Sequence, residues 1–326
     1  MNDLELPTPV LEIGGTHVTA ALVRHTPGSW TVAADSVVRR DLDAHAPASQ
    51  LLDALAAAAN SLGTGHNGRW GVALPEPFDY ASGIARYEHV GKFDGLQDVD
   101  VRAGLAERLG MALGTVTFLN DADAFGIGEV ALGAAGRSRR AVCITLGTGV
   151  GSSFLADGMP VKTGTDVPPD GSCYLLEYRG RPLEDTVSRR AIRRAYAAAA
   201  GASGSAGAPG AGAAGAPGDP DAGTPDVRDI AEAARAGDAV AAMVLERAFS
   251  AVGEAAAPYL SSFGTEVLIV GGSMTGSWDI VEPAIRKGMA AVEPGLAALP
   301  LRKAERSEEA GLVGAAYWAG HTAKGA

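Results

Sequence analysis

The chain has 326 residues, of which 47% are hydrophobic and 20% charged. This length favours two domains, and the composition excludes wholesale disorder. The net charge of −11 disfavours nucleic acid and anionic membrane surfaces as partners.

The cysteine content and the ends of the chain bear on location. Cys143 and Cys173 are too few for a disulfide framework or a four-cysteine metal site, which fits a reducing compartment. No apolar run approaches the roughly 20 residues of a spanning helix, and the first five residues lack the basic region of a signal peptide. We therefore expect a soluble cytoplasmic protein with no membrane or nucleic-acid partner.

Strand and helix signals alternate along the chain, which predicts an α/β fold. Apolar runs on both sides of Gly14-Gly15-Thr16 predict a β-hairpin, and the Ala- and Leu-rich stretch that follows has helical spacing. Strands are predicted at 70–74, 115–119, 141–146 and 267–270, and helices at 50–62, 121–129, 226–249, 280–292 and from 309 onward. Residues 201–225 contain no large apolar side chain and predict a flexible surface loop between two helices.

Two glycine-rich turns are candidate phosphate cradles. Gly14-Gly15-Thr16 and Gly147-Thr148-Gly149 each join two predicted strands, and amides without a neighbouring Cβ can approach phosphate oxygens. An ordinary glycine hairpin explains either turn equally well when it is taken alone. The repeat of the pattern indicates two duplicated halves that face one ligand.

Three polar residues next to predicted strands have two interpretations each. Asp121 is suited to accept the proton of an attacking hydroxyl, with Asn120 holding a second hydroxyl, but both types also cap helices, and spacing alone favours the cap. Glu12 lies in an apolar strand, where an unpaired charge is costly, so Mg²⁺ or a water shell would explain it. Alternatively, Glu12 lies on an edge strand and faces solvent.

Five motifs in this order resemble the ROK family of repressors, open reading frames and kinases, which includes bacterial glucokinases. They are LEIGGT at 11–16, LNDADA at 119–124, ITLGTGVG at 144–151, IVGGS at 269–273 and AGLVGAA at 310–316. The resemblance spans nearly the whole chain. It implies an actin-like, hexokinase-like (ribonuclease H-like) ATPase fold, with ATP on the larger of two α/β domains and a sugar in the central cleft.

The resemblance also assigns domains and site residues. It implies a small domain at 1–118, a large domain at 119–326, a C-terminal helix that packs back on the small domain, and a homodimer. Asp121 matches the catalytic base. Asn120 and Glu184 match sugar-binding residues, and Gly83 matches the turn before the sugar-contacting loop. The ATP-binding positions are Gly14, Gly15, Thr16, Gly147, Thr148, Gly149, Gly271 and Gly272.

The departures from the family pattern fall on the sugar side. Residues 164–184 contain Cys173 and no histidine, so the family's zinc motif of one His and three Cys is absent and we expect no structural zinc. Tyr174 is the candidate replacement for the family's zinc-site histidine. Glu76 replaces the glycine of a Pro-Gly-Pro turn and adds a carboxylate near the expected sugar pocket. The cluster YEHVGK at 87–92, which contains His89, lies near the same pocket, where relatives usually place an asparagine. A solvated loop is the alternative interpretation of Glu88, His89 and Lys92.

The sequence therefore predicts an ATP- and Mg²⁺-dependent kinase acting on the primary exocyclic hydroxyl of a glucose-like acceptor. The altered sugar side favours glucose or a modified ring, such as the amino sugar kanosamine or a C7-cyclitol. The alternative is a catalytically weak sugar sensor or regulator. DNA binding is not expected, because only about ten residues precede the first strand and they leave no room for a helix-turn-helix.

Overall fold

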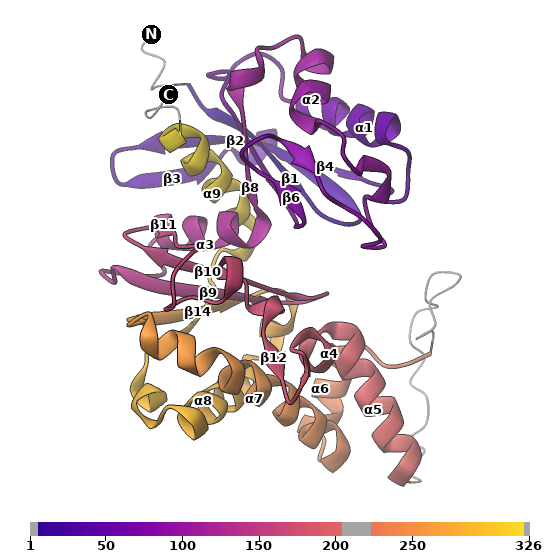
Figure 1. Cartoon of the computed structure of the whole chain (residues 1–326), viewed down its shortest axis with the longest axis vertical. Coiled ribbons are helices and arrows are strands. Elements are labelled where there is room, and N and C mark those ends of the chain that lie inside the picture. The colour runs from indigo at the N-terminus through magenta and orange to yellow at the C-terminus, as the bar shows by residue number, and fades with distance from the viewer. Residues whose placement is uncertain (1–5, 204–222, 323–326) are drawn as a thin grey trace. The chain divides into compact units, whose positions relative to one another are not determined.

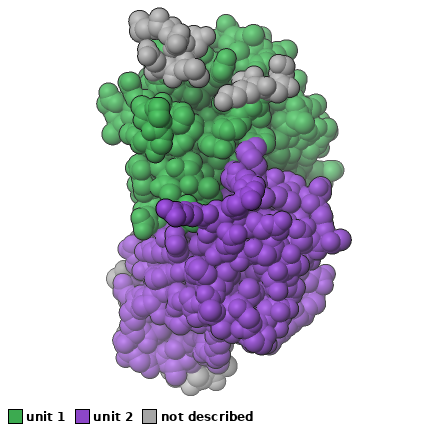
Figure 2. Space-filling view, turned by 90° about the vertical axis from the view of Figure 1, so that its left-hand side faces the viewer, with its two compact units in different colours: residues 1–136, 305–326 green, residues 137–304 purple. Residues whose placement is uncertain are grey.

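The computed structural model describes residues 6–203 and 223–322. The chain divides into two compact units, one formed by residues 1–136 with 305–326 and the other by residues 137–304 (Figure 2). The division lies at 136/137 and not at the 118/119 boundary expected from the sequence. Among the described residues, no helix is both long and apolar enough to cross a membrane.

The first unit is built on a six-stranded sheet (Figure 1). Its strand order is β3(Ser29–Val32), β2(His17–Thr26), β1(Thr8–Ile13), β5(Trp70–Leu74) and β8(Val116–Asn120), and β4(Val38–Asp41) pairs with β2. β1 and β2 form the antiparallel hairpin predicted around Gly14, whereas β1, β5 and β8 run parallel. β6(Phe78–Asp79) and β7(Ile84–Ala85) form a separate small hairpin.

Helices on both faces of this sheet complete the unit. They are α1(Ala48–Asn60), α2(Val101–Leu109), α3(Asp121–Ala131) and α9(Ser307–Thr322). Leu11 and Ile13 of β1 share a core cluster with leucines of α1. Because side chains alternate along a strand, Glu12 between them faces the other way, toward α9. α9 packs on β1, β5, β8 and α3, so the C-terminal helix belongs to the first unit.

Glycines allow α3 and α9 to pack with their backbones in contact. A Cβ on Gly314 would lie 1.8 Å from the carbonyl oxygen of Ala124, and one on Gly128 would lie 1.8 Å from that of Ala310. Only a residue without a side chain fits at such positions. This packing fixes α3, which begins with Asp121.

The second unit repeats the hairpin-and-parallel pattern in a five-stranded sheet. Its strand order is β11(Met159–Pro160), β10(Val150–Ala156), β9(Arg140–Leu146), β14(Val267–Gly271) and β15(Leu301–Lys303). β9 and β10 are antiparallel, and β9, β14 and β15 are parallel. A small hairpin, β12(Glu177–Tyr178) and β13(Arg181–Pro182), lies outside the sheet.

The helices of the second unit are α4(Glu184–Val187), α5(Arg189–Ser203), α6(Val227–Arg235), α7(Ala239–Ser262) and α8(Trp278–Val292). The helix predicted over 226–249 is wrong as a single element, because Gly237 has a φ of 98° and Asp238 caps a new helix, α7. Most of the loop predicted at 201–225 lies outside the described residues, and its first residues, 201–203, belong to α5.

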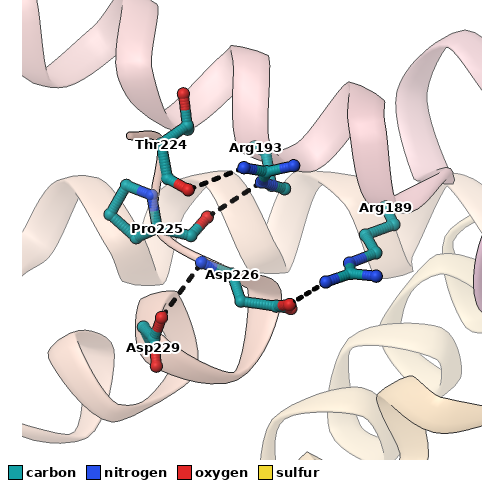
Figure 3. Close-up of polar contacts among 6 residues, drawn as sticks. All are labelled: Arg189, Arg193, Thr224, Pro225, Asp226 and Asp229. Atoms are coloured by element: carbon teal, nitrogen blue, oxygen red, sulfur yellow. Dashed lines mark hydrogen bonds and ion pairs between the residues drawn. The ribbon is translucent and has the colours of Figure 1, made fainter. Parts of the chain in front are cut away.

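Two arginines on α5 hold the start of α6 (Figure 3). Arg193 donates from Nη2 to the carbonyl oxygen of Thr224 at 2.7 Å and from Nε to that of Pro225 at 3.2 Å. Arg189 pairs with Asp226, the N-cap of α6, whose backbone N–H donates to Asp229. These contacts tie α6 to α5, whose first residue also donates its N–H to the carbonyl oxygen of Gly147 at 3.0 Å.

Candidate active site

The first glycine turn joins β1 to β2 and leaves its tip open to solvent. Gly14 donates its N–H to the carbonyl oxygen of His17 at 2.9 Å, which closes the turn, and Gly15 and Thr16 are exposed. The ordinary hairpin and the phosphate cradle are thus compatible, because the closing bond uses one amide and leaves exposed residues beside it. His17 Nδ1 lies 3.2 Å from Arg39 Nη2, which adds a cation beside the turn.

Glu12 is a partly buried carboxylate on a central strand. β1 lies between β2 and β5, so the solvent-facing edge interpretation is wrong. Burial, and next the negative charge of Asp121, raise the pKa of Glu12 to about 7, against a smaller lowering by Arg39. A Cβ on Gly311 of α9 would lie 2.4 Å from Glu12 Oε1, so glycine makes room for the carboxylate.

Asn120 and Asp121 lie where β8 ends and α3 begins. Asn120 Oδ1 accepts from the N–H groups of Ala122 at 2.9 Å and Asp123 at 3.1 Å, so the cap interpretation holds for Asn120. Asp121 is the first residue of α3, and its Oδ1 accepts from the N–H of Ala122 at 2.8 Å. Burial raises the pKa of Asp121, while the charge of Lys92 and the Ala122 N–H oppose that rise.

The amide nitrogen of Asn120 meets Tyr80, a residue that the sequence motifs do not indicate, and Tyr87 lies close to Tyr80. Asn120 Nδ2 donates to Tyr80 Oη at 3.3 Å, and Tyr80 donates to the carbonyl oxygen of Leu74 at 3.2 Å. Tyr87 donates to the carbonyl oxygen of Pro75 at 2.7 Å. Burial raises the pKa of both phenols, and the charges of Asp121 and Glu76 raise them further, so both tyrosines are neutral donors close to these carboxylates.

The fold alone explains the environments of Gly83 and His89. Gly83 has a φ of 82° in the β6–β7 hairpin, and a Cβ there would lie 2.8 Å from Arg102 Cβ, which is a structural reason for glycine. His89 and Glu88 are exposed, as the solvated-loop interpretation expects. Lys92 differs, because it is half-buried and its side chain lies beside Gly15. Sugar contacts of Gly83 and His89 stay predictions.

In the second unit, the two remaining glycine motifs come together. β9 and β14 are adjacent parallel strands, and their carboxyl ends carry Gly147 and Gly272. A Cβ on Gly272, whose φ is 89°, would lie 2.3 Å from the carbonyl oxygen of Leu146. Ligands of open α/β sheets bind at the carboxyl ends of strands. The juxtaposition of these motifs, far apart in sequence, therefore makes them one candidate nucleotide site.

Glu184 also lies at the second glycine turn. Its Oε1 accepts from the N–H of Val150 at 2.8 Å and occupies the space next to Gly149, where a Cβ would lie 2.2 Å from that oxygen. Thr148 is exposed at the tip of the turn. The backbone N–H of Val150 is therefore occupied by the carboxylate of Glu184.

Cys173 and Tyr174 lie in a short 3₁₀ helix of the second unit. Burial raises the pKa of the Cys173 thiol to about 11, and the thiolate is the form that binds metals. Within residues 6–203 and 223–322, no three His, Cys, Asp or Glu side chains gather as a metal site. The absence of a structural zinc and the replacement role of Tyr174, which is half-buried, stay predictions.

The chain is similar to one protein family and to several solved structures. Residues 9–322 match the ROK family. The glucokinase of Thermotoga maritima is 30% identical over 227 residues, which are 67% of this chain and 67% of that protein. The ROK hexokinase structure from Thermus thermophilus has a TM-score of 0.73 at 25% identity and covers 98% of this chain and 100% of its own. The ROK family glucokinase from Streptomyces griseus, solved with glucose and AMPPNP, has a TM-score of 0.70 at 24% identity, covering 97% and 99%.

Two α/β units built on the same hairpin pattern, with glycine turns at strand ends, define an actin-like, hexokinase-like ATPase fold, which confirms the predicted fold class. The chain belongs to the ROK family. The predicted class of enzyme, an ATP-dependent carbohydrate kinase, is confirmed as well.

Proposed function

We propose that this chain transfers the γ-phosphoryl group of ATP to the primary exocyclic hydroxyl of a glucose-like acceptor, with Asp121 as general base. The observation that carries the proposal is the junction of β8 and α3. There a half-buried carboxylate of raised pKa, that of Asp121, follows the N-cap asparagine of α3, whose amide nitrogen donates to Tyr80. A general base works best with a pKa near the working pH, and burial raises the pKa of Asp121 in that direction.

The proposed step conserves atoms and charge. The acceptor oxygen forms a bond to the γ-phosphorus as the bond from that phosphorus to the β,γ-bridging oxygen breaks, and ADP leaves with that oxygen. Asp121 takes the hydroxyl proton. Catalysis of this reaction is mostly positioning and charge stabilisation, which suits a base fixed at the first residue of a packed helix.

ATP would be held by the glycine turns, with Gly14, Gly15 and Thr16 in one unit and Gly147, Thr148, Gly149, Gly271 and Gly272 in the other. Glu12 fits Mg²⁺, because a partly buried carboxylate close to a second carboxylate favours a cation, and Mg²⁺ typically binds one or two carboxylates, waters and substrate phosphates. Glu12 would hold the ion through water. The ion would supply charge neutralisation on the phosphates.

Acceptor recognition would use Asn120 and Glu184, with Glu76, His89 and Tyr174 as candidate specificity residues. The charge of Glu76 reaches both Tyr80 and Tyr87, so a carboxylate lies near the candidate acceptor residues of the first unit. A carboxylate there would pair with the ammonium group of an amino sugar such as kanosamine. The second candidate is a C7-cyclitol. It has no anomeric centre and would therefore tolerate the loss of the family's zinc-site histidine.

The proposal is tested by ADP release with MgATP and a panel of acceptors. The panel contains glucose, mannose, glucosamine, kanosamine, N-acetylglucosamine, N-acetylmannosamine and a C7-cyclitol, and ³¹P NMR of the product identifies the phosphorylated hydroxyl. We expect one acceptor to be phosphorylated at its primary exocyclic hydroxyl. If an amino sugar is preferred, Glu76→Gln should reduce that preference. Product phosphorylated at a ring hydroxyl would contradict the proposal.

Absence of turnover with every acceptor, together with sugar binding by calorimetry, would favour the alternative of a weakly catalytic sugar sensor. The shared fold is what supports that alternative, because the ROK family includes repressors. The homodimer and the cytoplasmic location stay predictions, which size-exclusion chromatography with light scattering and cell fractionation would test.

A further inference from the structure

Lys92 lies over the first glycine turn with no salt bridge to any described residue. A Cβ on Gly15 would lie 3.9 Å from Lys92 Cδ, so the aliphatic part of the lysine lies beside the turn, on the side to which a Cβ would project. The side chain is half-buried, and its positive charge acts on Asp121. The lysine side chain therefore lies beside the turn, and its charge acts on the proposed general base.

The backbone around Lys92 is fixed by packing. Tyr87 and Phe93 are both buried, with ring centroids 5.3 Å apart, and they anchor the two ends of the loop. Phe93 donates its N–H to the carbonyl oxygen of Ala44 at 2.7 Å and has a φ of 61°, in the left-handed region that a non-glycine residue rarely adopts. Such a conformation persists where the surroundings impose it. The residue just before Phe93 is thus held over the turn.

The charges around the turn leave Lys92 available for an anion. Arg39, the other nearby cation, contacts His17 Nδ1 at 3.2 Å and acts on Glu12. Exposed turn amides with a fixed cation beside them are the elements of a phosphate site. We propose that Lys92 binds the γ-phosphoryl group of ATP together with the Gly15 turn, and that it neutralises this group during transfer. This inference rests on the proposed kinase function.

In the transfer step Lys92 gives up no proton and forms no covalent bond. The hydroxyl proton goes to Asp121, and the ammonium group stays charged beside the oxygens of the phosphoryl group. Removal of this charge should therefore weaken ligands that carry a γ-phosphate and slow transfer, while leaving ligands without that group unaffected.

The test compares AMPPNP and ADP, each with Mg²⁺, in calorimetric titrations of the wild type, Lys92→Met, Lys92→Arg and Lys287→Met. Lys92→Met keeps an unbranched apolar side chain and removes the charge, Lys92→Arg keeps the charge, and Lys287 is exposed on α8 of the other unit, where it pairs with Glu246. We expect Lys92→Met to weaken AMPPNP binding roughly tenfold or more, the scale of one hydrogen bond to a charged group. ADP binding should change less than twofold, and the other two variants should resemble the wild type.

Equal weakening of AMPPNP and ADP in Lys92→Met, or no weakening of either, would overturn the assignment. A rise in acceptor KM with unchanged AMPPNP affinity would overturn it too, since Lys92 would then contact the acceptor. If the wild type binds neither nucleotide, the proposed function fails, and titration with inorganic tripolyphosphate tests the anion site alone. In that titration, weaker binding to Lys92→Met supports the site, whereas equal binding or no binding to the wild type refutes it.

Discussion

The contact between α3 and α9 predicts that one glycine substitution reverses the usual effect of alanine in a helix. Gly314→Ala would place a Cβ 1.8 Å from the carbonyl oxygen of Ala124, an atom of the α3 backbone that cannot rotate away. Gly320, in the same helix, has no atom within 4 Å of its Cβ position and is the matched control. Helix propensity alone would stabilise both variants, by about 0.5–1 kcal/mol each.

The magnitude follows from the overlap. Unbonded carbon and oxygen atoms do not approach to 1.8 Å, so α3 and α9 must separate by roughly 1 Å or more in a close-packed interior. Overpacking of this kind costs about 1–3 kcal/mol, occasionally more. We therefore expect Gly314→Ala to lower the free energy of unfolding by about 1–3 kcal/mol and Gly320→Ala to raise it by about 0.5–1 kcal/mol.

Urea unfolding followed by tryptophan fluorescence measures this difference. Trp318 of α9 reports on the interface, since its indole N–H donates to the carbonyl oxygen of Phe118 at 3.1 Å. The midpoint should fall for Gly314→Ala and rise slightly for Gly320→Ala. Midpoints that shift in the same direction in both variants would refute the reasoning, because they would show that propensity and not the α3–α9 contact decides the outcome.

Two further predictions concern carboxylates. The folded pKa of Glu12, about 7, lies above its ordinary value of 4.5, so its contribution to stability is full below pH 4.5 and is lost as pH rises through 7. In the absence of Mg²⁺, the stability of Glu12→Gln relative to wild type should therefore rise by up to about 3 kcal/mol between pH 4.5 and 8. Melting temperatures of both proteins over this pH range measure the difference, and parallel pH curves would argue against the raised pKa. Glu184→Gln removes the negative charge of the carboxylate that accepts from the Val150 N–H. AMPPNP should then bind several-fold more tightly in the absence of acceptor, and the acceptor KM should rise. Weaker AMPPNP binding would count against a carboxylate competing with phosphate.

Local sequence determined much of the fold. The strand at Trp70–Leu74 was predicted to the residue, because an apolar run ends at Pro75, and the hairpins at Gly14 and Gly147 follow from apolar runs around glycine. The single helix over 226–249 failed because apolar periodicity continues past Gly237, while the backbone there turns left-handed and Asp238 starts a new helix. Periodicity records which residues are buried and not whether the helix axis continues.

Long-range packing decided what the sequence left open. The unit boundary moves from 118/119 to 136/137 because α3 packs on α9, a helix from the other end of the chain. The motifs indicate Asp121 and the glycine turns, but the sequence does not decide between a solvated loop and a ligand contact for Lys92. Lys92 lies beside Gly15 and directly before Phe93, whose left-handed backbone no spacing rule predicts.

The central claim, that Asp121 is the base of a sugar kinase, is tested most directly by Asp121→Asn with the acceptor identified in the panel. The variant should fold at least as stably as the wild type at neutral pH, because burial disfavours the charge that is removed. Acceptor binding by calorimetry should stay within a few-fold, and kcat should fall by roughly 10²–10⁴. Turnover close to wild type in a folded Asp121→Asn variant would contradict the account.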